Sequence, residues 1–320
     1  MAEVGCAGIL VADTFCGPMK RLPAAGQLLA IDQMPSKAGG CAANVAIDLA
    51  KQGVAADVCG CVGADASAEV LFESMRTAGV GCQQVRRVDS HPTSKTVILL
   101  VEGEDRRYIH VFGANAAFEV RHIGRDWLDG LKVFYLGGLL AMPAIATGQL
   151  AELLAHCRQK GIVTVVDVVV AQDRAGMAEL QPLLPHVDYF LPNDDEAQRL
   201  TGLADPQQQA DALLEHGVGT VVITRGPDGV LAASGDDRWQ AEACRFASVD
   251  PSGAGDAFAA GIVCGILRRW EMPRVLRYAS VLGGSATTAV GTTDGVFTAQ
   301  AAQAFVDQHP LDVTHFQEGT

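Results

Sequence analysis

Short apolar runs and stretches with helical spacing alternate along most of this chain. Residues 4–10, 54–62 and 162–170 are β-compatible runs rich in valine, isoleucine and leucine. Residues 65–78 and 299–308 instead repeat their apolar side chains with helical spacing. A run as continuous as residues 162–170 suits a parallel strand that is covered on both faces. The alternation therefore predicts an α/β fold with parallel strands.

Two segments interrupt this pattern. Residues 16–34 contain several prolines among apolar residues without a helical period, and residues 84–112 contain two β-type runs joined by polar residues, as in a hairpin. We expect these two segments to form the strands of a small lid. The remaining core of a single domain, residues 1–320, is predicted to consist of residues 1–15, 35–83 and 113–310. Residues 311–320 are predicted to be a loosely held tail.

The composition narrows the class of protein. A chain of 320 residues with 49% hydrophobic and 19% charged residues can bury a sizeable core. Its net charge of -13 argues against a nucleic-acid partner. The acidic N-terminus lacks a signal-peptide pattern, and no apolar run approaches the roughly 18 residues that a membrane span needs. The nine scattered cysteines include no CxxC pair, so we expect reduced thiols and a cytoplasmic location.

A glycine-rich turn precedes the long apolar helix predicted for residues 254–270. Its glycines, Gly253 and Gly255, allow backbone amides to approach an anion at the helix N-terminus. Asp256 places a carboxylate beside that anion site, which suits a base that takes a proton close to a phosphate. This combination indicates phosphoryl transfer to a hydroxyl. Taken alone, Asp256 is equally typical of a helix cap or a partner of the helix dipole.

Further polar residues stand at the ends of predicted strands and helices. Asp13 follows the first strand, at the edge where open α/β sheets bind ligands. The paired glycines Gly39 and Gly40 precede another helix, in which Asn44 can donate and accept hydrogen bonds. Asp167 interrupts a strand-like run, and its role as a neighbour of a ligand or as a structural acid stays open.

Together these stretches resemble the ribokinase-like (PfkB) carbohydrate kinases. Residues 39–44 and their helix are similar to the first signature of the family, and residues 250–258 are similar to the second. Residues 193–196 match its N-x-x-E motif, and residues 224–226 match its T-x-G motif. The resemblance implies a three-layer α/β/α domain with a mostly parallel central sheet and a small β-strand lid. It also implies ATP-dependent phosphorylation of a sugar hydroxyl by in-line transfer.

The resemblance also implies a role for each matched residue. Asp256 would be the base that deprotonates the acceptor hydroxyl, and the anion hole would consist of the amides of Gly253, Ala254 and Gly255. Sugar hydroxyls would be bound by Asp13, Gly39, Gly40 and Asn44. The nucleotide side would be formed by Asn193, Glu196, Thr224, Gly226, Gly229, Ser285 and Ala289.

The implied cofactors are ATP and Mg²⁺. Glu196 would hold Mg²⁺ through water, because hard cations prefer oxygen ligands. Asp250 resembles the family residue beside a monovalent cation site, so K⁺ is a further expectation. For Asn193 and Glu196, a plain helix-cap interpretation stays open.

Departures from the family pattern bear on the acceptor. Val11 stands where ribokinases often have asparagine, and Pro251 stands where threonine is frequent. Both departures weaken the case for ribose as the acceptor. We expect a neutral sugar as the acceptor, although Arg106 and Arg107 on the lid carry charges that would attract an anionic one. The role of Arg225 stays open. If the lid exposes an apolar face, its strands can pair into a homodimer.

Two alternatives share this fold: a nucleoside kinase, and a sugar-binding or regulatory homologue without catalytic activity. Asp256 argues against the second. A dinucleotide-dependent dehydrogenase would need GxGxxG after the first strand, and a P-loop enzyme would need a Gly-Lys pair; the sequence contains neither. The histidines show no metal-binding spacing.

Overall fold

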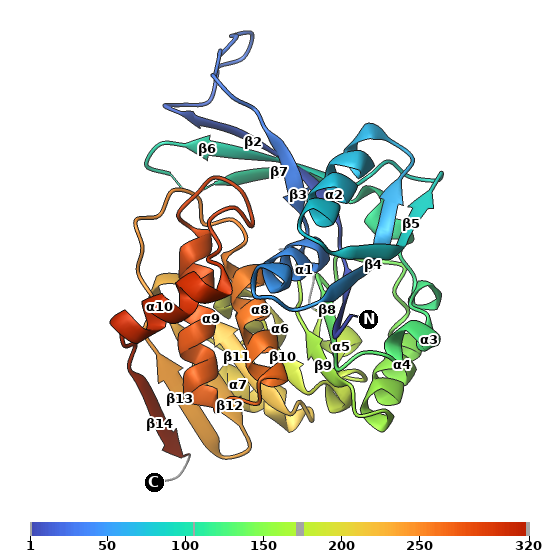
Figure 1. The fold of residues 1–320 in the computed structure, drawn as a ribbon, viewed down its shortest axis with the longest axis vertical. Helices are drawn as coiled ribbons and strands as arrows, with labels where there is room; N and C mark the ends of the chain where they lie inside the picture. Colours follow the sequence, from blue (N-terminus) through green and yellow to red (C-terminus); the bar gives the residue numbers. More distant parts are fainter. Residues whose placement is uncertain (1, 105, 171–175, 318–320) are drawn as a thin grey trace.

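The computed structural model describes residues 2–104, 106–170 and 176–317. A ten-stranded sheet crosses the molecule (Figure 1). From one edge to the other its strands are β14 (Val313–Gln317), β13 (Asp237–Ala241), β12 (Val230–Ser234), β11 (Thr220–Thr224), β10 (Tyr189–Phe190), β9 (Val163–Val166), β8 (Val133–Gly137), β1 (Val4–Gly8), β4 (Ala56–Gly63) and β5 (Gly81–Val88). The strands from β11 to β5 pair in parallel, whereas β12, β13 and β14 are antiparallel.

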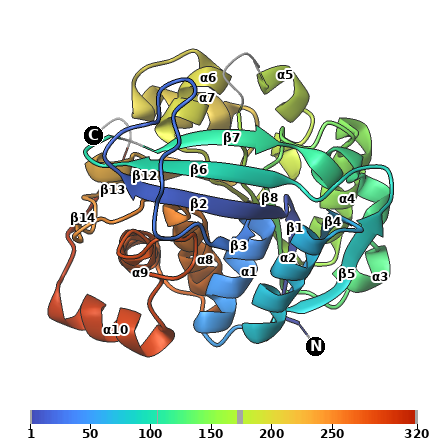
Figure 2. The ribbon, with the colours of Figure 1, turned by 90° about the horizontal axis from the view of Figure 1, so that it is seen from above.

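Helices cover both faces of this sheet (Figure 2). One face carries α1 (Cys41–Lys51), α2 (Ala66–Thr77), α8 (Ala254–Leu267), α9 (Met272–Ala286) and α10 (Ala299–Gln308). The other carries α3 (Arg125–Leu128), α4 (Thr147–Gln159), α5 (Met177–Leu180), α6 (Asp194–Thr201) and α7 (Pro206–Glu215). Each helix layer buries its own hydrophobic core against the sheet. The predicted three-layer α/β/α arrangement is confirmed.

A second, four-stranded sheet projects from the main domain as the lid (Figure 1). Its order is β3 (Ser36–Gly39), β2 (Val11–Met19), β6 (Lys95–Val101) and β7 (Arg107–Val111), and β6 and β7 form an antiparallel hairpin. The predicted lid boundaries are wrong at two places. β2 and β3 extend the lid into residues assigned to the core. Residues 84–88, assigned to the lid, belong to β5 of the large sheet, because β4, α2 and β5 form one parallel crossover unit.

The predicted loose tail is also wrong for the part of it that the structure describes. β14 adds to the sheet edge by pairing antiparallel with β13. His315 stacks on Trp239 with their ring centroids 5.2 Å apart. Residues 318–320 lie outside the described residues. An open strand edge offers unpaired backbone groups, and β14 satisfies those of β13.

The helix α8 is apolar on all sides because it is packed on all sides. Its residues Ala257 to Gly265 are buried, and a side chain at Gly261 would collide with the Ala279 backbone of α9. The predicted helix to residue 270 ends at Leu267. Among the helices of the described residues, none is long and apolar enough to cross a lipid bilayer.

Candidate active site

The N-terminus of α8 forms the centre of the site. Its cap residue Gly253 has a positive φ of 79°, and a Cβ at this position would collide with the Thr292 carbonyl. No side chain in the described part of the chain caps this helix end. The first-turn amides of a helix lack intrahelical acceptors and so favour an anion at this end; here the Ala254 amide makes a long hydrogen bond of 3.4 Å to the Pro251 carbonyl. Gly255 has open space around its Cα, which leaves room for such a ligand.

The candidate base Asp256 is held by the helix that follows the Gly39-Gly40 turn. Asn44 of α1 donates from Nδ2 to Oδ2 of Asp256 at 2.7 Å. The Asn44 Oδ1 atom accepts a hydrogen bond of 2.8 Å from the Thr292 hydroxyl. Asn44 was predicted to bind a sugar hydroxyl, and in the structure its carboxamide contacts Asp256 and Thr292. The fold thereby joins two signature stretches that lie 212 residues apart.

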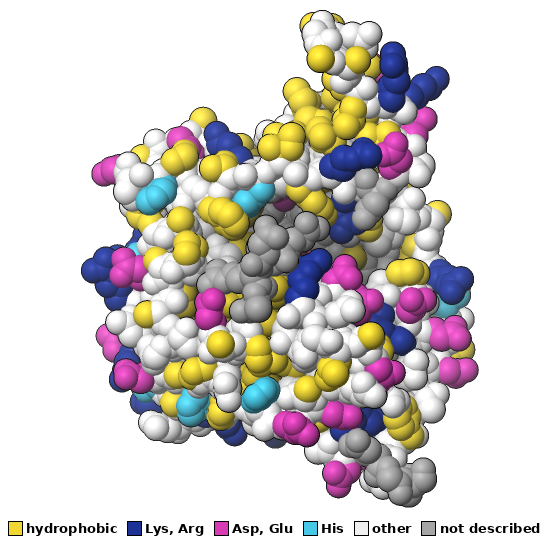
Figure 3. Space-filling view, turned by 180° about the vertical axis from the view of Figure 1, so that it is seen from behind, with side chains coloured by type: hydrophobic (Ala, Val, Ile, Leu, Met, Phe, Trp, Pro, Cys, Tyr) yellow, Lys and Arg dark blue, Asp and Glu magenta, His cyan; other side chains and the backbone are white. Residues whose placement is uncertain are grey.

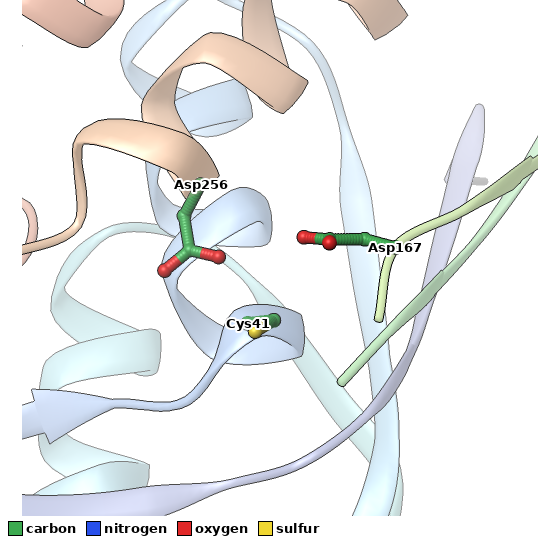
Figure 4. Close-up of side chains that lie close together, drawn as sticks. All are labelled: Cys41, Asp167 and Asp256. Atoms are coloured by element: carbon green, nitrogen blue, oxygen red, sulfur yellow. The ribbon is translucent and has the colours of Figure 1, made fainter. Parts of the chain in front are cut away.

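Cys41 and Asp167 lie beside Asp256 (Figure 4). The Cys41 sulfur and a carboxylate oxygen of each aspartate are all within 4.8 Å of one another. Tyr135 of β8 donates its hydroxyl proton to Asp167 at 3.0 Å. Neither Cys41 nor Tyr135 was predicted to have a role in the site. For Cys41 the available signal was its place directly after the paired glycines, at the first residue of α1.

Burial disfavours the charged form of the carboxyl groups in this site. Burial raises the pKa of Asp256, and hydrogen bonds from Asn44 and Cys41 partly oppose that rise. Burial also raises the pKa of Asp13 to about 7, with a further contribution from the charge of Asp256. The pKa of the Cys41 thiol is raised well above its usual value by burial and by the Asp256 charge. Cys41 is therefore a neutral thiol that donates a hydrogen bond to Asp256.

Asp167 and Glu196 extend this acidic region. The pKa of Asp167 is raised well above its usual value by burial and then by the charges of Glu196 and Asp256. Burial raises the pKa of Glu196 to about 7. The charges of acidic groups that lie close together are compensated when a cation binds beside them. Their oxygen donors are the type that Mg²⁺ prefers, so these residues fit that ion.

The helix-cap interpretation of Asn193 and Glu196 is also supported. The Glu196 amide donates to Oδ1 of Asn193 at 2.8 Å, and Oε2 of Glu196 accepts from the Asn193 amide at 3.0 Å. This capping box starts α6.

Asp13 lies in the lid strand β2, rather than in the main sheet. It is only 6% exposed, and a Cβ at Gly39 would collide with its carboxylate. Gly40 has a positive φ of 86°, and a side chain there would come within 2.5 Å of the Ile9 carbonyl. Glycine is therefore needed at both positions of the turn. The turn brings Asp13 and the start of α1 to the same place.

A cavity of about 530 Å³ lies on the other side of the α8 N-terminus, within the size range of small-molecule sites. Predicted residues that line it are Thr224, Gly226, Gly229, Ala254 and Gly255. Asn193 and Glu196 lie outside its lining. Phe258 of α8 and Phe246 contribute aromatic surface to this cavity.

Ser285 and Ala289 were predicted to lie on the nucleotide side, but neither residue lines this cavity. The α9 side of its lining consists of Ser280, Gly283, Gly284 and Thr287. These positions follow helical spacing and so share one face, whereas Ser285 is turned away from it. Ser285 instead donates to the Leu282 carbonyl and accepts from the Phe297 amide. Ala289 lies beyond the end of α9, outside the lining.

Asp250 connects two loops behind the site. Its Oδ1 accepts from the Ser252 amide at 3.0 Å, and its Oδ2 accepts from the Gly291 amide at 3.1 Å. Asp250 is completely buried. Arg225, whose role was open, lies outside the cavity lining and donates to the Asp228 carbonyl. The carboxylate of Asp250 thus holds the turn that precedes α8.

Comparisons with known proteins show the family of this chain. A family model described as "pfkB family carbohydrate kinase" matches residues 1–299. The ATP-dependent 6-phosphofructokinase of Thermoanaerobacterium thermosaccharolyticum is 23% identical over 247 residues, which are 74% of this chain and 75% of that protein. The 2-dehydro-3-deoxygluconokinase of Bacillus subtilis is 26% identical over 280 residues, which are 83% of this chain and 86% of that protein.

Solved structures share the fold. The Arabidopsis thaliana ribokinase complexed with ribose and ATP matches with a TM-score of 0.82 at 24% identity, covering 96% of this chain and 99% of that one. A putative ribokinase II from E. coli, in complex with ATP and Mg²⁺, has a TM-score of 0.81 at 20% identity and covers 97% of this chain and 100% of that one. The family match identifies a phosphotransferase that acts on an alcohol group. The chain belongs to the pfkB family of carbohydrate kinases.

Proposed function

We propose that this protein transfers the terminal phosphoryl group of ATP to a hydroxyl of a neutral sugar. The observation that carries this proposal is the position of Asp256. It lies in the first turn of α8, hydrogen-bonded to Asn44. Its neighbour Gly255 lines the cavity, and its charge raises the pKa of the lid residue Asp13.

The chemistry follows from this arrangement. Asp256 removes the proton of the acceptor hydroxyl, and a raised pKa brings a carboxylate closer to the value that suits a base near neutral pH. The amides of Gly253, Ala254 and Gly255 stabilise the charge on the transferred phosphoryl group. The lid excludes water from the acceptor, which limits hydrolysis of ATP.

Mg²⁺ would be held by Glu196 through water, with Asp167 beside it. When bound, the ion neutralises charge on the phosphate oxygens during transfer. The charges of Glu196 and Asp256 both raise the pKa of Asp167, which supports a role for Asp167 near both of these residues. K⁺ would bind near Asp250, although two amides already occupy its carboxylate oxygens.

A neutral acceptor is supported by the charges around the site. Asp13, Asp167 and Asp256 are all acidic, and an anionic sugar would be repelled by their ionised forms. Lys37 of the lid is engaged by Asp294 and by the Val290 carbonyl, each at 2.8 Å. A nucleoside remains the alternative acceptor.

We also propose a homodimer through the lid, in the cytoplasm. The lid exposes large hydrophobic side chains, including Leu28 (92%), Ile109 (64%) and Met34 (60%). In Figure 3 hydrophobic side chains gather on the projecting lid. Burial of such a patch by a second copy would remove it from water. Light scattering of the wild-type protein tests this assembly.

The experiment for the proposed activity is ADP release with ATP, Mg²⁺ and a panel of neutral sugars, sugar acids and nucleosides. We expect turnover of a neutral sugar, and a loss of at least about a hundredfold in kcat for Asp256→Asn with sugar binding retained. The matched control is Asp126→Asn, which changes an exposed aspartate in the first turn of α3. Near-normal turnover by Asp256→Asn would remove this residue from its role. Thermal stabilisation by sugars without any ADP would indicate a binding protein.

A further inference from the structure

Three side chains that can bind a metal ion converge beside the N-terminus of α8 (Figure 4). Cys41 is the first residue of α1, Asp167 directly follows β9, and Asp256 lies in the first turn of α8. The Cys41 sulfur and one carboxylate oxygen of each aspartate are all within 4.8 Å of one another. Because the three residues come from separate elements, only the folded chain brings these ligand atoms together.

The spacing of these atoms suits an ion of the size of Zn²⁺. Zinc binds sulfur at about 2.3 Å and carboxylate oxygen at about 2.1 Å, so two ligand atoms of a tetrahedral site lie about 3.5 Å apart. With each pair of atoms here at most 4.8 Å apart, a closure of no more than about 1.3 Å completes such a site. Both aspartates are partly exposed, so an ion from solvent can reach them.

Hydrogen bonds already orient the two carboxylates. Tyr135 donates its hydroxyl proton to Oδ2 of Asp167 at 3.0 Å, and Asn44 donates from Nδ2 to Oδ2 of Asp256 at 2.7 Å. In metal sites, donors of this kind fix the orientation of the ligands and contribute to the affinity for the ion. The two carboxylates are therefore held in place before any ion binds.

Charge and ligand type determine the class of ion. Within residues 2–104, 106–170 and 176–317, no lysine or arginine forms an ion pair with Asp167 or Asp256. A divalent ion beside them would compensate their charge. Thiolate ligands favour zinc, whereas Mg²⁺ prefers oxygen ligands alone. Cys41 therefore distinguishes this group of ligands from the Mg²⁺ region proposed at Glu196.

We propose that Cys41, Asp167 and Asp256 bind Zn²⁺, and that zinc bound there inhibits the kinase. On binding, a bond forms between zinc and the Cys41 sulfur, and the thiol proton is released to solvent. Zinc also occupies an oxygen of Asp256, the group that would take the proton of the acceptor hydroxyl. The inhibition rests on the proposed function, whereas the binding of zinc does not.

The binding test uses Co²⁺ as a spectroscopic substitute for zinc. The full chain, treated with a chelator, is titrated with Co²⁺ in the absence of ATP and sugar. We expect a thiolate-to-cobalt charge-transfer band in the near ultraviolet, which added Zn²⁺ removes. Cys41→Ser should lose this band. Cys82→Ser is the matched control and should keep it, because Cys82 is another partly exposed cysteine, in the edge strand β5, where it bonds to the Val80 carbonyl.

Zinc affinity, measured by equilibrium dialysis, tests the other residues of the site. Asp167→Asn changes a ligand while it keeps the size of the side chain, and it should weaken zinc binding by at least about tenfold. Tyr135→Phe removes only the donor to Asp167. It should weaken binding by about tenfold and retain the cobalt band, as a positioning residue would.

The binding proposal is overturned if the wild-type protein gives no cobalt band, or if the band survives in Cys41→Ser. Melting temperatures establish which variants are folded. If Cys41→Ser does not fold, Asp167→Asn decides the question, and wild-type zinc affinity in that variant would overturn the site as well.

Zinc inhibition is tested by ADP release with Mg²⁺ and ATP in fixed excess. We expect Zn²⁺ to lower the turnover of the wild-type protein, with half-inhibition in Tyr135→Phe at about tenfold more Zn²⁺. Because Zn²⁺ also binds ATP, Cys41→Ser measures the inhibition that arises elsewhere. Equal zinc sensitivity in all three proteins would overturn the inhibitory role. A wild-type protein that phosphorylates no acceptor would contradict the proposed function, and the cobalt titration would still decide whether the metal site exists.

Discussion

Replacement of Asn44 separates two roles that the same residue can have. The sequence suggests a contact with a sugar hydroxyl, whereas the structure shows its Nδ2 atom donating to Asp256 at 2.7 Å. In Asn44→Leu a side chain of similar size lacks both polar atoms. The base then loses a donor that favours its ionised form, and Thr292 loses an acceptor. Asn44 is only 2% exposed, so water does not replace the lost donor readily.

The two roles predict different magnitudes in different kinetic constants. A hydrogen bond to a charged group contributes about 1.5–3 kcal/mol, which corresponds to about a 10- to 150-fold fall in kcat. A neutral hydrogen bond to the sugar contributes about 0.5–1.5 kcal/mol and would appear as about a 2- to 13-fold rise in KM. Loss of the donor also raises the pKa of Asp256 further. The acid limb of kcat therefore moves to higher pH in the variant.

The assay is ADP release as a function of sugar concentration and pH, with sugar binding measured by calorimetry. We expect a lower kcat, a nearly unchanged KM and a shifted acid limb. Thr292→Val removes the hydrogen bond to Oδ1 of Asn44 but leaves the Asn44–Asp256 bond in place. It should therefore lower kcat by a smaller factor than Asn44→Leu does. Melting temperatures establish that the variants remain folded. An unchanged kcat together with a raised KM would refute the positioning role and restore the sugar contact.

Three further predictions concern other parts of the fold. Asp48 is completely buried, and its two carboxylate oxygens have no hydrogen-bond partner among the described residues. Because unpaired buried polar atoms destabilise the fold, Asp48→Leu should raise the free energy of unfolding by about 1–3 kcal/mol, as measured by urea denaturation. Because burial raises the folded-state pKa of Asp48, wild-type stability falls as the pH rises from about 4 toward that pKa, and the variant should lose this part of the pH dependence. Gly39→Ala would collide with the Asp13 carboxylate, so the KM for the sugar should rise by about tenfold or more, with ATP binding unchanged; normal sugar kinetics would contradict this geometry. Gly255→Leu fills open space in the cavity lining and should raise the KM for ATP by about tenfold, or about 1.4 kcal/mol, while an unaffected KM would place the nucleotide elsewhere.

The glycine-rich turns and their acids were predictable because their requirements are local. Gly253 and Gly40 have positive φ values that other residues rarely adopt. Their neighbours Asp256 and Asn44 are then fixed at helix starts by chain connectivity. The order of such stretches, read together with the strand and helix periods, was enough to predict the fold class and to propose Asp256 as the base.

The contacts made by these residues required the folded chain. Cys41, Tyr135 and Asp167 come from separate elements and meet only because α1 packs beside the carboxyl ends of β8 and β9. Ser285 was misplaced because each residue turns a helix by about 100°, so one position changes the face of α9 that reaches the cavity. The tail was misjudged because pairing of β14 depends on the open edge of β13 rather than on its own sequence.

The amino-acid sequence by itself indicated which side chains are candidates for the chemistry and where the backbone must be glycine, since both properties depend on a few adjacent residues. The tertiary structure alone decided which of them meet: Asn44 bonds to Asp256, and Asp13 lies opposite Thr96 across the lid strands. Contacts between residues far apart in the chain depend on strand register and helix rotation. Those are set by the packing of the whole core, and no local pattern encodes them.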